Sequence, residues 1–247
     1  MSPDRNGGSA VTAQELRDHT RVFLQPIAPP SILGLFGFAG ATFIVAAWLA
    51  GWYGSPSTPL FLAPFWLTFG GIAQLLAGMW AYRARDGLAT AMHGMWGAFW
   101  IAFGILFILD AAGALTATAP AFKDAFGYWF FALAVITGCG AIAAIVESIG
   151  LFSVLTTLAV GSAFVAIGYL TNAAPAAGGG WLQAAGWVLF ASSVLATYTA
   201  TAMMLESTWG RVVLPLGKLA KRANIPGERF TIPVEHEFAE PGVRHGQ

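Results

Sequence analysis

Two long stretches of this chain contain no Asp, Glu, Lys or Arg, and they constrain the fold more than any other feature. The first runs over 61 residues, from Val22 to Tyr82, and the second over 58 residues, from Ser148 to Leu205. A transmembrane helix needs about 20 apolar residues, so each stretch can hold two helices and a turn. Charged residues make up only 10% of the chain, against about 25% in soluble domains. We therefore expect an integral membrane protein.

Turn-forming residues divide both stretches. The sequence GSPSTP (54–59) interrupts the first and TNAAPAAGGG (171–180) interrupts the second, and clusters of Gly, Pro and small polar residues mark loops. Two single apolar segments lie between the two stretches. The sequence thus predicts an all-α, six-transmembrane-helix bundle, with helices over about 32–53, 60–82, 88–109, 125–146, 149–171 and 182–206.

The basic residues predict how the bundle is oriented. Eleven of the twelve Lys and Arg residues fall in the two terminal segments or between the second and third helices, and only Lys123 falls on the other side. The positive-inside rule then puts both termini in the cytoplasm and the bundle in the plasma membrane. We expect a cytoplasmic N-terminal segment (1–25), a transmembrane transport domain (26–217) and a cytoplasmic C-terminal tail (218–247). A capping-box pattern from Thr12 to Glu15 also predicts a short helix reaching about Leu24.

Few chemically reactive side chains lie in the predicted spans. A lone histidine, His93, cannot supply the paired ligands of a membrane haem, and no span contains a lysine for a Schiff base. No nucleotide-binding or hydrolytic motif is present, and the net charge of zero gives no reason to expect a nucleic-acid partner. We expect no enzyme, no cofactor and no metal. Because ionisable groups inside a membrane are functional candidates, His93 is a candidate proton relay; the alternative is a hydrogen bond to a backbone carbonyl.

The sequence PIAPPSILGLFGFAG (26–40) places three prolines and three glycines at the start of the first predicted span. Proline is tolerated there because the first N–H groups of a helix have no internal acceptor. Those free N–H groups and the positive end of the helix dipole suit an anion. Two interpretations remain open: an entry segment that meets a small anion, or an ordinary helix start with glycines for packing.

Four motifs resemble those of the acetate uptake transporter family, which includes bacterial acetate–succinate permeases and fungal acetate and ammonium transporters. They are PPSILGLFGF (29–38), FGGIAQLLAGMWAY (69–82), HGMWGAFW (93–100) and GRVVLPLG (210–217). Their order and spacing agree with the family from residue 29 to residue 217. The resemblance implies a six-helix protomer with a solute path through each subunit, assembled as a homohexamer. It also implies acetate and related short monocarboxylates as substrates, and succinate in some members.

The resemblance also assigns site residues. It places a hydrophobic constriction at Phe38, Trp96 and Leu158. The family tyrosine of this constriction corresponds to Trp96, whose larger ring can only donate a hydrogen bond. A narrower passage, or a preference for a more apolar acid, would follow. For substrate binding we predict the entry segment, the family glutamine and one fifth-helix hydroxyl, which are Pro30, Leu33, Gly34, Leu35, Gln74 and Thr157.

The leading hypothesis is a membrane transporter or channel for acetate-like monocarboxylates. Its substrate would be met by backbone N–H groups and passed through the hydrophobic constriction, either as the anion or as the neutral acid, because no buried Lys or Arg can pair with it. Two alternatives stand beside it. One is a channel for ammonia or another small neutral solute, and the other is a membrane structural subunit that transports nothing.

Overall fold

In a computed structural model, which describes residues 27–55, 57–115, 120–171 and 180–218, the chain is helical throughout its core. Six segments are long and apolar enough to cross a membrane, which confirms the predicted six-helix bundle. The predicted helix after Thr12 and nearly all of the C-terminal tail lie outside the described residues. The elements are α2 (Pro30–Leu49), α3 (Thr58–Phe65), the π-helix η1 (Trp66–Ala73), α4 (Gln74–Ala84), α5 (Gly87–Ala111), α6 (Pro120–Ala144), α7 (Ile149–Leu170) and α8 (Trp181–Trp209).

The second span, formed by α3, η1 and α4, is not the uniform α-helix that the sequence predicts. Pro64 lies inside α3 and has no backbone N–H to donate to the preceding turn. Just after it, eight residues wind as the π-helix η1. The hydroxyl of Thr68 donates to the carbonyl oxygen of Pro64 at 2.8 Å, so this carbonyl has a partner where the helix changes type. The π-helix ends directly before Gln74, the predicted binding glutamine.

The first span also ends earlier than predicted. Helix α2 stops at Leu49. Trp52 and Tyr53, which end the predicted span (32–53), lie in the turn that follows. There the backbone N–H of Trp52 donates to the carbonyl of Ala47 at 3.0 Å, and the hydroxyl of Tyr53 donates to the carbonyl of Ile44 at 2.7 Å. The first bond satisfies a carbonyl group that the last turn of a helix leaves free, and the second ties the turn back to α2, so this turn replaces the predicted final helical turn.

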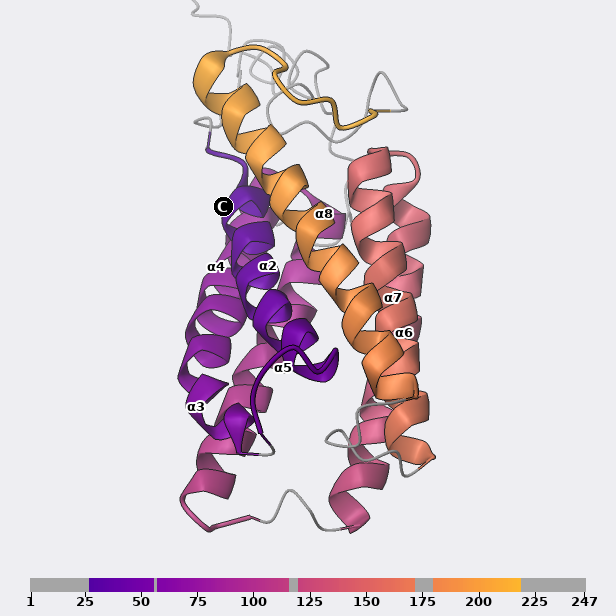
Figure 1. The fold of residues 1–247 in the computed structure, drawn as a ribbon. Helices are drawn as coiled ribbons and strands as arrows, with labels where there is room; N and C mark the ends of the chain where they lie inside the picture. The colour runs from indigo at the N-terminus through magenta and orange to yellow at the C-terminus, as the bar shows by residue number, and fades with distance from the viewer. Residues whose placement is uncertain (1–26, 56, 116–119, 172–179, 219–247) are drawn as a thin grey trace, which may run out of the picture.

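The helices form two groups that α8 joins. Figure 1 shows α2 to α5 on one side, the α6–α7 hairpin on the other, and α8 crossing obliquely between them. Helix α6 packs mainly on α7, α8 packs on both α2 and α7, and α5 and α6 meet mainly through aromatic side chains. Helices α2, α5 and α7 all begin at the end of the bundle where α8 finishes (Figure 1). The space between the two groups is bordered by these three parallel helices and by two antiparallel ones, α6 and α8.

Small residues bring neighbouring helices close together, as expected for packing in lipid. A Cβ atom at Gly78 would lie 2.6 Å from the backbone nitrogen of Gly94, and one at Gly97 would lie 2.6 Å from that of Leu75. Helices α4 and α5 could not approach so closely with larger residues at these two positions. Large apolar side chains point outward instead: Phe61 is 77% exposed and Ile142 is 70% exposed. Six apolar spans with such an outer surface make this an integral membrane protein.

Candidate functional site

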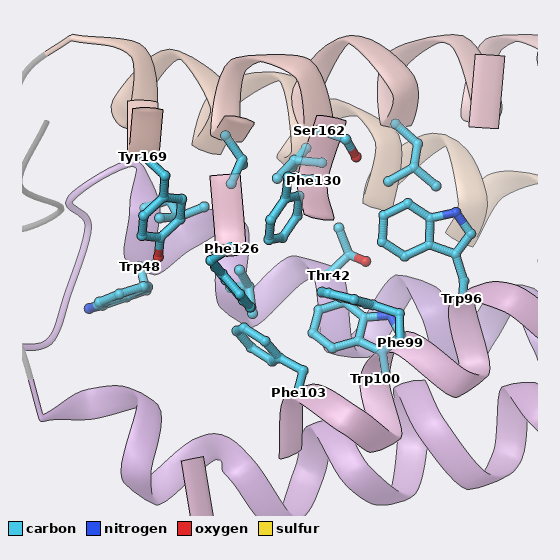
Figure 2. A pocket seen from close by; sticks show the side chains of 15 residues that line it. Thr42, Trp48, Trp96, Phe99, Trp100, Phe103, Phe126, Phe130, Ser162 and Tyr169 are labelled. Carbon is cyan, nitrogen blue, oxygen red and sulfur yellow. The ribbon is translucent and has the colours of Figure 1, made fainter. Parts of the chain in front are cut away.

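Two cavities follow one another along the bundle. The larger cavity, of about 370 Å³, lies at the end where α2, α5 and α7 begin. The smaller cavity, of about 30 Å³, lies further along the same helices, and Figure 2 shows its side chains converging from them, with Trp96 at one end and Trp48 and Tyr169 at the other. A cavity of the smaller size has room for one or two water molecules.

The three parallel helices present their residues to these cavities in the same order. On each helix, a residue that lines the larger cavity is followed one turn later by one of the three predicted constriction residues, and another turn later by a residue that lines the smaller cavity. One turn of an α-helix rises about 5.4 Å, so all three constriction residues occupy the same level between the cavities. The series are Leu35, Phe38 and Thr42 on α2, Met92, Trp96 and Trp100 on α5, and Leu155, Leu158 and Ser162 on α7.

The three residues at this intermediate level are almost completely buried: Phe38 is 2%, Trp96 is 3% and Leu158 is 2% exposed. The rings of Phe38 and Trp96 meet edge to face, with centroids 6.3 Å apart. Trp96 and Leu158 also form part of the wall of the smaller cavity. The structure thus brings together, between two cavities, the residues that the family resemblance selects. They meet through aromatic rings and an aliphatic side chain.

Three residues of the predicted entry segment lie at the larger cavity or next to it. Pro30 and Leu35 line that cavity. Gly34 lies against the imidazole of His93, because a Cβ atom at Gly34 would lie 2.5 Å from the ring. Leu33 points the other way, is 48% exposed and lines neither cavity. The entry segment therefore presents only one face of its helix to the candidate site.

The two remaining predicted binding residues line neither cavity. Gln74 is 3% exposed and its side-chain oxygen has no hydrogen-bond partner, and its backbone faces Gly37 of α2. The hydroxyl of Thr157 donates back to its own helix, to the carbonyl of Ser153 at 2.8 Å. Such bonds within a helix are common for Ser and Thr, and they take this hydroxyl away from the candidate site.

Three helix N-termini open on the larger cavity, but only one of them lacks a side-chain cap. Asp86 accepts a hydrogen bond from the backbone N–H of Ala89 at the start of α5, at 2.9 Å, and Ser148 accepts one from Leu151 at the start of α7, at 3.2 Å. Helix α2 begins after Pro29 with no side-chain cap and no acidic residue in its first turn. The donors at the start of α2 therefore face the cavity without a side-chain acceptor.

His93 is the histidine of the larger cavity. It is 5% exposed, and its Nδ1 atom has no hydrogen-bond partner. The charged side chains that line the same cavity are Asp86, Glu147, Glu206 and Lys218, of which Glu206 and Lys218 form an ion pair at 2.9 Å. Sequence analysis did not place these four charges at the site, although the predicted orientation puts all of them at the cytoplasmic end. Among the described residues, no three His, Cys, Asp or Glu side chains could hold a metal ion.

The smaller cavity is lined mostly by aromatic and aliphatic side chains, and three of its lining residues carry a fully buried polar atom that lacks a partner. These atoms are the hydroxyl oxygens of Thr42 and Ser162 and the indole nitrogen of Trp100, and Figure 2 shows these side chains around one space. A buried polar group without a partner costs about 1–3 kcal/mol. Trp100 and Ser162 were not among the predicted site residues, although Trp100 belongs to the HGMWGAFW motif.

Comparison with known proteins agrees with this geometry. The profile of the GPR1/FUN34/yaaH family matches residues 14–221. The succinate-acetate/proton symporter SatP of Escherichia coli K12 is 27% identical over 194 residues, which cover 78% of this chain and 96% of that protein. A solved structure of the bacterial acetate channel SatP matches with a TM-score of 0.69 at 26% identity, covering 77% of this chain and 99% of the other. The ammonia transport outward protein 2 of Saccharomyces cerevisiae is 34% identical over 83 residues, 33% of this chain and 28% of that protein.

Proposed function

This chain belongs to the GPR1/FUN34/yaaH family, and we propose that it carries acetate and related short-chain monocarboxylates across the plasma membrane, as a transporter or channel and not as an enzyme. The names of the SatP relatives support this substrate class. The observation in the structure that carries the proposal is the order of the two cavities, with an apolar level of three residues between them. A small solute that follows α2, α5 and α7 would meet these regions in turn.

The larger cavity would receive the carboxylate. The first turn of α2 offers backbone N–H groups and the positive end of its dipole, which favour an anion without a buried cation. Pro30, Leu35 and His93 line this approach, and the Nδ1 atom of His93 has no hydrogen-bond partner. His93 would hydrogen-bond the carboxylate or pass it a proton, and so contribute to binding without being essential.

Phe38, Trp96 and Leu158 would form the dry constriction. A charged group at the centre of a bilayer costs a few kcal/mol or more, so this apolar level should be the main barrier to the anion. Beyond it, the polar atoms of Thr42, Trp100 and Ser162 would hydrogen-bond the carboxyl group again. A dicarboxylate such as succinate would have one carboxylate group at the apolar level while the other is bound, so we expect acetate to be preferred over succinate.

We also propose an orientation and an assembly. The larger cavity lies at the end that the basic residues assign to the cytoplasm, so both termini would be cytoplasmic and the smaller cavity would lie nearer the outer face. The outward apolar surface would contact lipid and neighbouring subunits in a homohexamer. The mass of the purified protein in detergent, measured by light scattering, tests the hexamer.

Uptake of labelled acetate into proteoliposomes tests the proposed function. We expect saturable uptake that propionate inhibits well and succinate inhibits weakly. The partial similarity to a yeast ammonia transporter makes ammonia flux the second measurement on the same vesicles. Ammonia flux that acetate does not affect, with no acetate uptake, would favour the ammonia channel. No flux of either solute through correctly assembled protein would favour a structural subunit.

A further inference from the structure

The indole of Trp96 is held by a hydrogen bond that crosses between the two helix groups. Its Nε1 donates to the hydroxyl oxygen of Thr137 on α6 at 3.0 Å, and Thr137 is 0% exposed. The backbones of α5 and α6 come close at few positions, and the two helices also meet through aromatic rings, such as Phe99 and Phe130 with centroids 5.4 Å apart. The hydrogen bond adds a directional polar link between the α2–α5 group and the α6–α7 hairpin at the level of the proposed constriction.

The other buried tryptophans on the described part of the chain differ in this respect. Trp66 and Trp100 are 0% and 3% exposed, and neither indole nitrogen has a hydrogen-bond partner. Both rings pack against other aromatic rings, Trp66 for example against Phe103 at 4.7 Å between centroids. The hydrogen bond is thus not a general requirement for burying tryptophan in this fold. It occurs at the one of the three rings that lies between the two cavities.

Three contacts fix the orientation of the Trp96 ring. Phe38 meets it edge to face at 6.3 Å, and Phe99 does so at 5.2 Å, which are ordinary separations for aromatic pairs. Ring contacts of this kind tolerate rotation about the side-chain bonds better than a hydrogen bond does, because the hydrogen bond needs a nearly linear N–H direction. Thr137 is therefore the neighbour that selects one rotamer of Trp96.

We propose that Thr137 is a positioning residue that keeps Trp96 across the path, and that breaking their hydrogen bond widens the constriction. The inference rests on the proposed function, because it assumes that small carboxylates pass this level. Without the Thr137 hydroxyl, the buried indole N–H has no acceptor in its present orientation, and orientations that move the ring out of the path gain population. The net contribution of one hydrogen bond corresponds to about a two- to tenfold change in such an equilibrium.

The test compares acetate and butyrate uptake by proteoliposomes containing wild type, Thr137→Val, Thr137→Ser and Trp96→Phe proteins. Valine keeps the shape of threonine and removes the acceptor, so we expect acetate uptake to rise about threefold and the butyrate-to-acetate ratio to rise further. Thr137→Ser keeps the hydroxyl and should restore wild-type uptake and selectivity. Thr197→Val is the matched control, because the Thr197 hydroxyl bonds only to Ser193 of its own helix, at 2.9 Å.

Trp96→Phe removes the donor and makes the test specific. In a Trp96→Phe background, Thr137→Val should cause no further change, because the bond is already absent. An equal effect of Thr137→Val with and without Trp96 would overturn the inference, and so would unchanged or reduced uptake by the single Thr137→Val protein.

If Thr137→Val fails to assemble, the Trp96→Phe and Thr137→Ser proteins decide. The inference then requires that Trp96→Phe raises the butyrate-to-acetate ratio and that Thr137→Ser leaves this ratio unchanged. A wild-type protein that takes up no acetate would instead contradict the proposed function itself.

Discussion

The larger and the smaller cavity differ in the charged and polar groups that their walls offer to a charged solute. The wall of the larger cavity carries charges of both signs, from Lys218 and three carboxylates, together with His93 and helix N-termini, so a carboxylate there can stay hydrated. The smaller cavity has no charged side chain on its wall, and three of its lining residues carry a buried polar atom without a partner. On the proposed path, the larger cavity would accommodate the charge of the solute, and the smaller cavity would select for dehydration and size.

Adding a fixed negative charge to each cavity should separate them most strongly. We expect Ser162→Asp in the smaller cavity to lower acetate uptake at least about thirtyfold, because a carboxylate buried among aromatic rings cannot be paired and repels the substrate. Ser207→Asp, at the exposed rim of the larger cavity, should lower it less than about twofold because water screens the charge. Uptake is measured per assembled protein. Equal losses in the two variants would show that the cavities do not differ as described.

A methyl group added to α2 should act through His93. Gly34→Ala places a Cβ atom 2.5 Å from the imidazole, so the ring must move into the larger cavity or α2 must move away from α5. We expect acetate uptake to fall about tenfold, in line with a displaced binding group. The matched control is Gly40→Ala on the same helix, where nothing lies within 4 Å of the added atom. An equal loss of acetate uptake in Gly40→Ala would show that the effect of Gly34→Ala does not act through His93.

Replacing His93 tests whether the larger cavity supplies a proton. His93→Gln keeps a polar side chain that cannot be protonated, so the dependence of acetate uptake on pH should weaken by about threefold. Four other charged side chains, Asp86, Glu147, Glu206 and Lys218, line the same cavity and would leave some pH dependence. An unchanged pH profile would remove His93 from any role in proton transfer.

Removing a hydroxyl from the smaller cavity should have the smallest effect, and it should change stability and acetate uptake in opposite directions. Thr42→Val removes a buried hydroxyl without a partner, so the free energy of unfolding should stay level or rise by up to about 1 kcal/mol. Acetate uptake should fall about twofold if this hydroxyl hydrogen-bonds the passing carboxyl group. Thermal unfolding and uptake on the same preparation measure both. A variant that is less stable and transports normally would contradict this assignment.

Sequence analysis predicted the number of spans because lipid requires long apolar helices whatever their packing. It could not predict the direction in which each side chain points, because these helices are apolar on all sides and carry no amphipathic pattern. Leu33 and Leu35 illustrate this: the same motif contains both, yet only Leu35 faces the larger cavity. Phe38, Trp96 and Leu158 were found through family resemblance and not through periodicity. Ser162 was missed because it lies in an ordinary small-residue stretch and its role depends on the neighbouring helices.

The π-helix η1 was missed for a related reason. Pro64 signals a break in the second span, but a proline alone does not say whether the helix will kink, end or widen. The close packing of Gly70 and Gly71 against Trp100 and Ile101 of α5 accompanies the wider turn. This packing depends on a helix that begins some 16 residues later in the chain, and no local pattern contains it.

The most direct test of the account is acetate uptake by Leu158→Phe compared with Val160→Phe. Both changes add a ring to α7, but Leu158 is 2% exposed at the level between the cavities and Val160 is 40% exposed on the outer surface. If the two cavities belong to one path, Leu158→Phe should lower acetate uptake about tenfold and Val160→Phe should leave it near the wild-type value. Wild-type uptake by a correctly assembled Leu158→Phe protein would show that acetate does not pass between Phe38, Trp96 and Leu158.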